Sequence, residues 1–166
     1  LPPLVTETAR NKPMHPCSKF NCRYCLRLDK TGVITSTSTG RSYFTRKTVS
    51  CQSNNIIYCL TCTKCNLQYV GQTKNKLADR FVVHFNHIEP TRAPKKLKAK
   101  TTDKSNSKFV DPIGRHYKSI QHNGLKDVHI HILHFITAPS NSIPGKQLRD
   151  HLERKWIHRL RTLSPL

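Results

Sequence analysis

Residues 55–84 read NIIYCLTCTKCNLQYVGQTKNKLADRFVVH, and this stretch predicts the centre of the fold. Two short runs rich in β-branched and aromatic residues alternate in side-chain character, as residues of β-strands do. Cys62 and Cys65 stand between these runs, where a hairpin turn is expected. Beyond the second run, residues 74–87 place large apolar side chains at intervals of four, which predicts a helix.

The rest of the chain predicts three further elements and one long loop. Residues 112–121 are expected to form a short helix, 128–136 a third strand and 146–163 a final amphipathic helix. The basic, polar stretch 90–108 has no apolar period and is expected to be a loop. These elements predict an α/β chain of the α+β type, with a small three-stranded, mainly antiparallel sheet flanked by helices.

Charge and cysteine content limit the classes of function. The chain carries 29 Lys and Arg against 9 Asp and Glu, a net charge of +20, which points to a polyanionic partner. Nucleic acid is favoured over a membrane, because there is no long amphipathic basic helix and no spanning segment. Only 36% of the residues are apolar, and the seven cysteines have knuckle spacings. Zinc in a reducing compartment is therefore expected to support the small core, rather than disulfides.

Two groups of residues have the composition and spacing of zinc sites. The first group is Cys17, Cys22, Cys25 and Cys51, of which Cys51 lies furthest away in the sequence. The second group is Cys62, Cys65, His116 and His122, with His87 as a rival ligand. Four thiolates, or two thiolates with two imidazoles, complete a closed tetrahedral site. Free cysteines in an unfolded arm are the alternative for the first group.

A third constellation combines two phenols, a guanidinium, an imidazole and a carboxylate. Tyr58 and Tyr69 stand four residues on either side of the Cys62/Cys65 pair, so we expect them to be near neighbours across the hairpin. Arg80 and His84 are four residues apart and share one helical face. Glu153 lies at the flank of an apolar helical face, where a carboxylate needs a cation or hydrogen-bond donors. The alternatives are that the two tyrosines serve only in packing and that Glu153 forms an ordinary salt bridge.

Taken together, the order and spacing of these residues resemble the GIY-YIG nuclease superfamily over roughly 54–163. Ile56-Ile57-Tyr58 stands at the first motif, with isoleucine in place of its glycine, and Tyr69-Val70-Gly71 stands at the second. Arg80-x3-His84 matches the helix that follows. Glu153-x2-Trp156-Ile157 matches the distal helix with the family's metal-binding glutamate. The cysteines look like those of the endonuclease that follows the reverse transcriptase in Penelope-like retroelements.

This resemblance implies a function, a set of roles and an organisation. The implied activity is nicking of target DNA by phosphodiester hydrolysis, which primes insertion of the element. Tyr58, Tyr69, Arg80, His84 and Glu153 would be catalytic, and Glu153 would hold Mg²⁺ or Mn²⁺. The implied divisions are a tail at 1–16, a cysteine-rich zinc-binding linker at 17–53 and the endonuclease at 54–166. A fused reverse transcriptase, RNA of the element as a further partner and a nuclear location are also expected, and the first residue, Leu1, suits a piece of a longer polypeptide.

Basic residues outside these motifs are expected to contact phosphates through nonspecific, salt-dependent interactions. The candidates are Lys74, Lys76, Lys95, Lys96, Lys98, Lys100, Arg115 and Arg149. A solvated charged surface is the alternative for them. The rival function is a noncatalytic zinc-binding module that binds nucleic acid, which uses the same charge and cysteines but needs no catalytic constellation.

Overall fold

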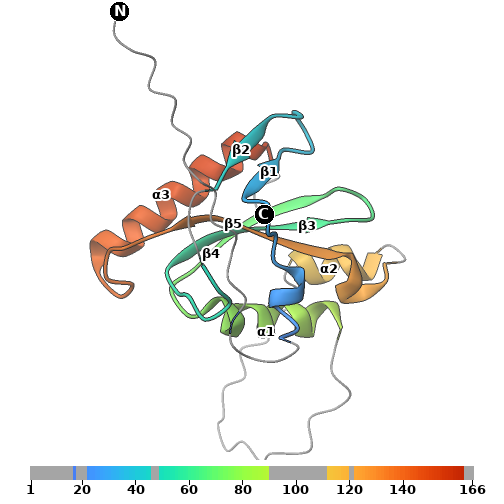
Figure 1. Ribbon diagram of the computed structural model, residues 1–166, viewed down its shortest axis with the longest axis horizontal. Helices are drawn as coiled ribbons and strands as arrows, with labels where there is room; N and C mark the ends of the chain where they lie inside the picture. The colour runs from blue at the N-terminus through green and yellow to red at the C-terminus, as the bar shows by residue number, and fades with distance from the viewer. Residues whose placement is uncertain (1–16, 18–21, 46–48, 90–111, 120–121, 163–166) are drawn as a thin grey trace, which may run out of the picture.

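The computed structural model of the protein describes residues 17, 22–45, 49–89, 112–119 and 122–162 (Figure 1). The predicted tail at 1–16 and the whole of the predicted basic loop at 90–108 lie outside the described residues.

A three-stranded antiparallel sheet forms the centre of the molecule, in the order β4-β3-β5. These strands are β3 (Ile56–Cys62), β4 (Gln68–Thr73) and β5 (Val128–Phe135). The middle strand β3 is buried on both faces, which explains its nearly continuous apolar sequence. The predicted fold class is therefore confirmed. Gly71, the last residue of the second motif, lies inside β4.

The hairpin register places the two tyrosines two residues apart along the strand pair. Tyr58 pairs with Gly71 and Leu60 pairs with Tyr69, so the two tyrosines are diagonal rather than directly opposite. The turn extends to Asn66, which adopts a left-handed conformation at φ 61° and donates its N–H to the Cys62 carbonyl. Because side chains in a strand alternate with a period of two, this shift leaves both tyrosines on the same face of the sheet.

Helices cover both faces of the sheet (Figure 1). On one face, α1 (Leu77–Ile88) and α2 (Pro112–Ser119) enclose a core with Tyr58, Phe81 and Phe85. On the other face, α3 (Ile143–Leu160) packs through Trp156. The Ser142 hydroxyl caps α3 by accepting a hydrogen bond from the Gly145 N–H, and a proline stands in the first turn, as helix starts prefer.

The cysteine-rich stretch is folded into the same unit. It contains the short 3₁₀ helix η1 (Cys25–Arg27) and a hairpin of β1 (Val33–Thr35) with β2 (Ser42–Phe44), which the sequence did not predict. Cys25, Leu28, Val49 and Cys51 share the core of α1, and Ile34 shares the core of α3. The packing thus joins this stretch to the residues that follow.

Candidate functional site

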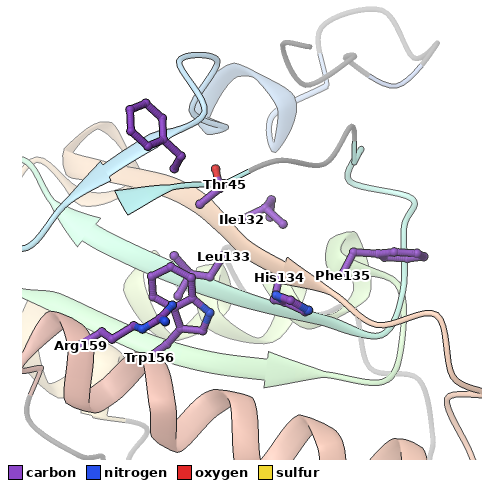
Figure 2. A pocket seen from close by; sticks show the side chains of 8 residues that line it. Thr45, Ile132, Leu133, His134, Phe135, Trp156 and Arg159 are labelled. Carbon is purple, nitrogen blue, oxygen red and sulfur yellow. The ribbon is translucent and has the colours of Figure 1, made fainter. Parts of the chain in front are cut away.

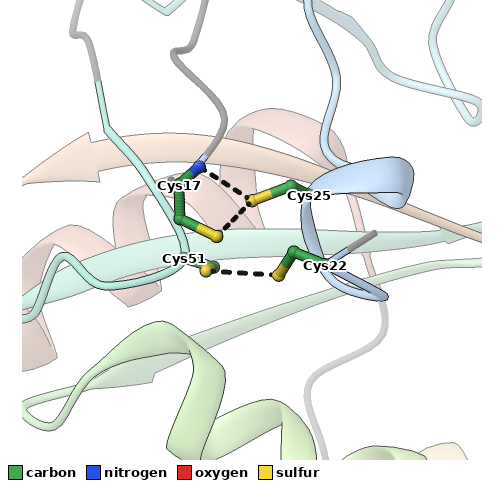
Figure 3. A group of neighbouring side chains, drawn as sticks. All are labelled: Cys17, Cys22, Cys25 and Cys51. Carbon is green, nitrogen blue, oxygen red and sulfur yellow. Dashed lines mark hydrogen bonds between the residues drawn. The ribbon is translucent and has the colours of Figure 1, made fainter. Parts of the chain in front are cut away.

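Four cysteines from three segments converge beside the start of α1 (Figure 3). The Sγ atoms of Cys22 and Cys51 lie 3.6 Å apart, those of Cys17 and Cys25 lie 3.4 Å apart, and all four lie within 4.8 Å of one another. Tetrahedral thiolates at the Zn–S distance of 2.3 Å are about 3.8 Å apart. The group expected from the sequence, including the distant Cys51, can therefore hold a metal ion.

The thiols of this first cluster differ in acidity. Burial by itself raises the pKa of Cys22, but hydrogen bonds from the Cys25 and Tyr24 backbones and contacts with Cys17 and Cys51 lower it to about 7. Burial raises the pKa values of Cys25 and Cys51. Because metals bind thiolates, an ion held by these four residues would displace protons from the buried thiols.

A second cluster lies at the tip of the β3–β4 hairpin and combines Cys62, Cys65, His116 and His122. The Cys65 Sγ and the His116 Nε2 are 3.4 Å apart, and the rings of His116 and His122 are 4.5 Å apart. His87, the rival ligand, is not a member of this group. Burial, followed by the neighbouring His122, lowers the pKa of His116, which keeps its ring neutral and able to bind a metal.

Tyr117 forms a wall of the second cluster that sequence reasoning missed. Its ring packs against those of His116 and His122 at 4.9 and 4.8 Å. Its hydroxyl donates to the Asp127 carbonyl at 3.3 Å. Burial, then the charge of Cys62, raises the pKa of Tyr117. Its position beside His116 in the helix was the available sequence signal, and it orients the ring that a metal would need.

Three of the five expected catalytic side chains form one hydrogen-bonded group, in which Tyr58 and His84 are buried and Arg80 is partly buried. The Tyr58 hydroxyl lies 2.7 Å from the His84 Nε2, and the Arg80 Nε donates to the same hydroxyl at 3.2 Å. Arg80 and His84 thus act from one face of α1, as their spacing predicted. Tyr58 and His84 have no exposed surface, so neither side chain faces an open cleft. The half-buried Tyr69 packs its ring 6.1 Å from that of His84.

Gly71 makes the position of the Tyr58 hydroxyl possible. A Cβ atom added at Gly71 would lie 2.7 Å from the Tyr58 Oη, 2.8 Å from its Cζ and 3.0 Å from the Tyr69 Cε1. No other residue type fits without displacing the phenol. The glycine is required here by close packing, and not by its backbone angles. Ile56, which stands at the glycine of the first motif, is instead wholly buried in the α1 core.

Glu153 reaches this region from the other face of the sheet, past the edge strand β4. The Gln72 Nε2 donates to the Glu153 Oε2 at 2.7 Å and to the Asp150 Oδ1 at 2.8 Å. Burial raises the pKa of Glu153, and the positive charge of Arg80 acts in the opposite direction. Sequence reasoning missed Gln72 and Asp150, although Asp150 lies one helical turn before Glu153. Two adjacent carboxylates supply the oxygen ligands that hard divalent cations prefer.

The predicted phosphate contacts divide into three groups. Lys74, Lys76 and Arg115 are exposed. Arg149, by contrast, is only 5% exposed, and its Nη1 donates to the Asn55 Oδ1 at 2.6 Å and to the Ser140 carbonyl at 2.8 Å. It stabilises the loop before α3. The remaining candidates lie outside the described residues: Lys95, Lys96, Lys98 and Lys100.

Comparison with protein-family models, with curated proteins and with solved structures finds no match to this chain. Within the described part of the chain, no helix has both the length and the apolar character needed to cross a membrane.

Proposed function

We propose that this protein is a metal-dependent DNA endonuclease of the GIY-YIG type, which nicks target DNA to prime insertion of a Penelope-like retroelement. The observation that carries the proposal is the meeting of Arg80, Tyr58 and His84 at one hydroxyl, against a glycine in an edge strand. Packing alone does not require an arginine and a histidine at that hydroxyl, and burying His84 costs solvation free energy.

The residues act on the phosphodiester as follows. Arg80 is held at its Nε by Tyr58, so its terminal N–H groups bind the nonbridging phosphate oxygens. Tyr58 accepts a proton from the attacking water and passes its own phenolic proton to His84. Tyr69, which is half buried beside His84, orients the phosphate by a hydrogen bond.

Glu153 is the proposed ligand of Mg²⁺ or Mn²⁺, with Asp150 beside it. When bound, such an ion neutralises phosphoryl charge and stabilises the leaving oxygen. Gln72 holds both carboxylates in place before the ion binds. Burial raises the pKa of Glu153, and a bound cation would offset that cost of its charge.

A supercoiled-plasmid nicking assay with Mg²⁺ or Mn²⁺ tests this proposal, comparing wild type with Glu153→Gln and Arg80→Ala. We expect open circles from wild type and none from either variant. Glu153 has a raised pKa in the folded state, so its charge costs stability above that pKa, and Glu153→Gln is expected to unfold at no lower a temperature at pH 7. Lys155→Ala, at an exposed position two residues along α3, is the control and should nick normally.

The competing function is a noncatalytic zinc-binding module that binds nucleic acid. It is favoured by the two cysteine clusters and the charge of +20. If the wild type folds, binds zinc and binds DNA but does not nick DNA with any divalent metal, this function is established and the nuclease proposal is refuted. The nuclease proposal also includes zinc in both clusters, fusion to a reverse transcriptase, RNA as a further partner and a nuclear location.

A further inference from the structure

The β1–β2 hairpin and the end of α3 together form a basic and aromatic surface that the nicking site does not use. The Ser36 hydroxyl donates to the Leu160 carbonyl at 2.7 Å, the Ser38 hydroxyl to the Arg161 carbonyl at 3.3 Å and the Tyr43 hydroxyl to the Arg159 carbonyl at 3.0 Å. These bonds satisfy the last carbonyls of the helix, which have no partners within it. The hairpin and the helix end are therefore held as one surface.

Two hollows adjoin on this surface and share Arg159. The first has a volume of about 220 Å³ and lies between the hairpin, β5 and α3, with Trp156 and Arg159 at one end and His134 and Phe135 at the other (Figure 2). The second has a volume of about 610 Å³ and is lined by Arg41, Arg159 and Arg161 together with Tyr43 and His158. We call the two together the hairpin groove.

The position of Arg159 suits it to hold a phosphate next to a base. Its guanidinium carbon lies 5.2 Å from the centre of the Trp156 ring and 5.9 Å from that of Tyr43. These two rings pack edge to face at 5.7 Å. An arginine held on aromatic rings loses little conformational freedom on binding and still presents its N–H groups outward. Phe44 of β2 lines the first hollow and is 63% exposed.

The charge of the hairpin groove is complementary to one kind of partner. Among the described residues that line the two hollows there are three arginines and no carboxylate. Apolar and aromatic surface in the smaller hollow accepts the face of a base, while the arginines of the larger hollow accept the backbone. A duplex keeps its bases stacked inside and cannot offer a base face to such a hollow, whereas a single strand can.

We propose that the hairpin groove binds single-stranded DNA, with a base in the smaller hollow against Phe44 and the adjoining phosphates on Arg159 and Arg41. The choice of DNA over RNA rests on the proposed nicking function, which releases a DNA strand. The smaller hollow is lined by β5 at one edge of the sheet, whereas Gly71 and Tyr69 of the proposed nicking site lie in β4 at the other edge.

Trp156 provides the probe, because it is the only tryptophan of the chain and it lines the smaller hollow. Titration of the zinc-loaded protein with a 20-nucleotide oligo(dT), without Mg²⁺ or Mn²⁺, should change its fluorescence with saturation. Phe44→Ala and Arg159→Ala should each weaken binding about tenfold. Arg159→Ala should also lower the slope of log affinity against log salt by about 0.7, and Phe44→Ala should leave that slope unchanged. Leu148→Ala and Lys155→Ala, exposed on α3 outside the groove, are the matched controls.

The outcomes separate this inference from the nuclease proposal, because no cleavage is measured. No saturable change in Trp156 fluorescence, or an equal loss of affinity in the controls, would overturn the groove. Tighter binding of oligo(U) or of duplex DNA, lost in the Phe44 and Arg159 variants, would overturn the assignment to single-stranded DNA. If the protein does not nick DNA but shows the expected changes in binding, the groove proposal is supported and the nuclease proposal is refuted. Unchanged far-ultraviolet circular dichroism of the variants shows that they fold.

Discussion

Replacing Gly71 by alanine tests whether that glycine holds the Tyr58 hydroxyl in place. The added Cβ would lie 2.7 Å from the Tyr58 Oη and 2.8 Å from its Cζ, and the phenol is fully buried. Overpacking a buried site costs about 1–3 kcal/mol. The displaced hydroxyl would also move away from its partners, His84 at 2.7 Å and Arg80 at 3.2 Å. Losing a buried hydrogen bond completely costs about 1–3 kcal/mol, and a partial displacement costs a fraction of that.

We therefore expect Gly71→Ala to lower the free energy of unfolding by about 2–3 kcal/mol, which for a chain of this size lowers the Tm by about 4–12 °C. Urea unfolding followed by Trp156 fluorescence measures the first quantity, and plasmid nicking should fall with it because Arg80 loses its anchor. In a Tyr58→Phe background the same substitution should cost less, since the nearest atom is gone. A Gly71→Ala protein with wild-type stability and nicking would refute the close-packing argument.

Two further predictions concern the metal clusters and the dependence of stability on pH. At the start of α1, the Cys51 carbonyl accepts the Ala78 N–H and the Ser53 carbonyl accepts the Leu77 N–H. Cys51→Ser should therefore lose about one zinc and also lose hydrogen-exchange protection at Ala78, whereas Cys65→Ser should lose zinc and keep that protection. Equal protection of Ala78 in both variants would contradict this coupling between the first cluster and α1. Burial, then His129, lowers the pKa of His131 from 6.5 to about 4, although the Asp29 carboxylate 3.9 Å away acts in the opposite direction. The folded state then binds fewer protons than the unfolded state below pH 6.5, so stability should fall as the pH drops from 6.5 through 4. Urea midpoints should fall less steeply over this range in His131→Phe than in wild type, and parallel slopes would show that another group is responsible.

Residue spacing predicted the elements and the composition of both metal clusters. A strand or a helix leaves its period in the sequence, which is why β3, β5, α1 and α3 were expected close to where they lie. The β1–β2 hairpin left no such trace, since each of its strands has three residues. Knuckle spacing brought Cys17, Cys22 and Cys25 together, but only the packing of residues 49–51 against α1 shows that Cys51 joins them.

The candidate site shows the same division at the level of single atoms. Arg80 and His84 were placed on one face of a helix by a local rule, and that placement holds. The chain by itself therefore determined which groups are present and which of them share a helix or strand. Only the tertiary structure decided that Asn66 extends the turn, that Arg149 is buried, and that Gln72 holds two carboxylates from the opposite helix. The physical reason is that spacing along one element follows from backbone geometry, whereas contacts between elements depend on strand register and on which face each helix covers.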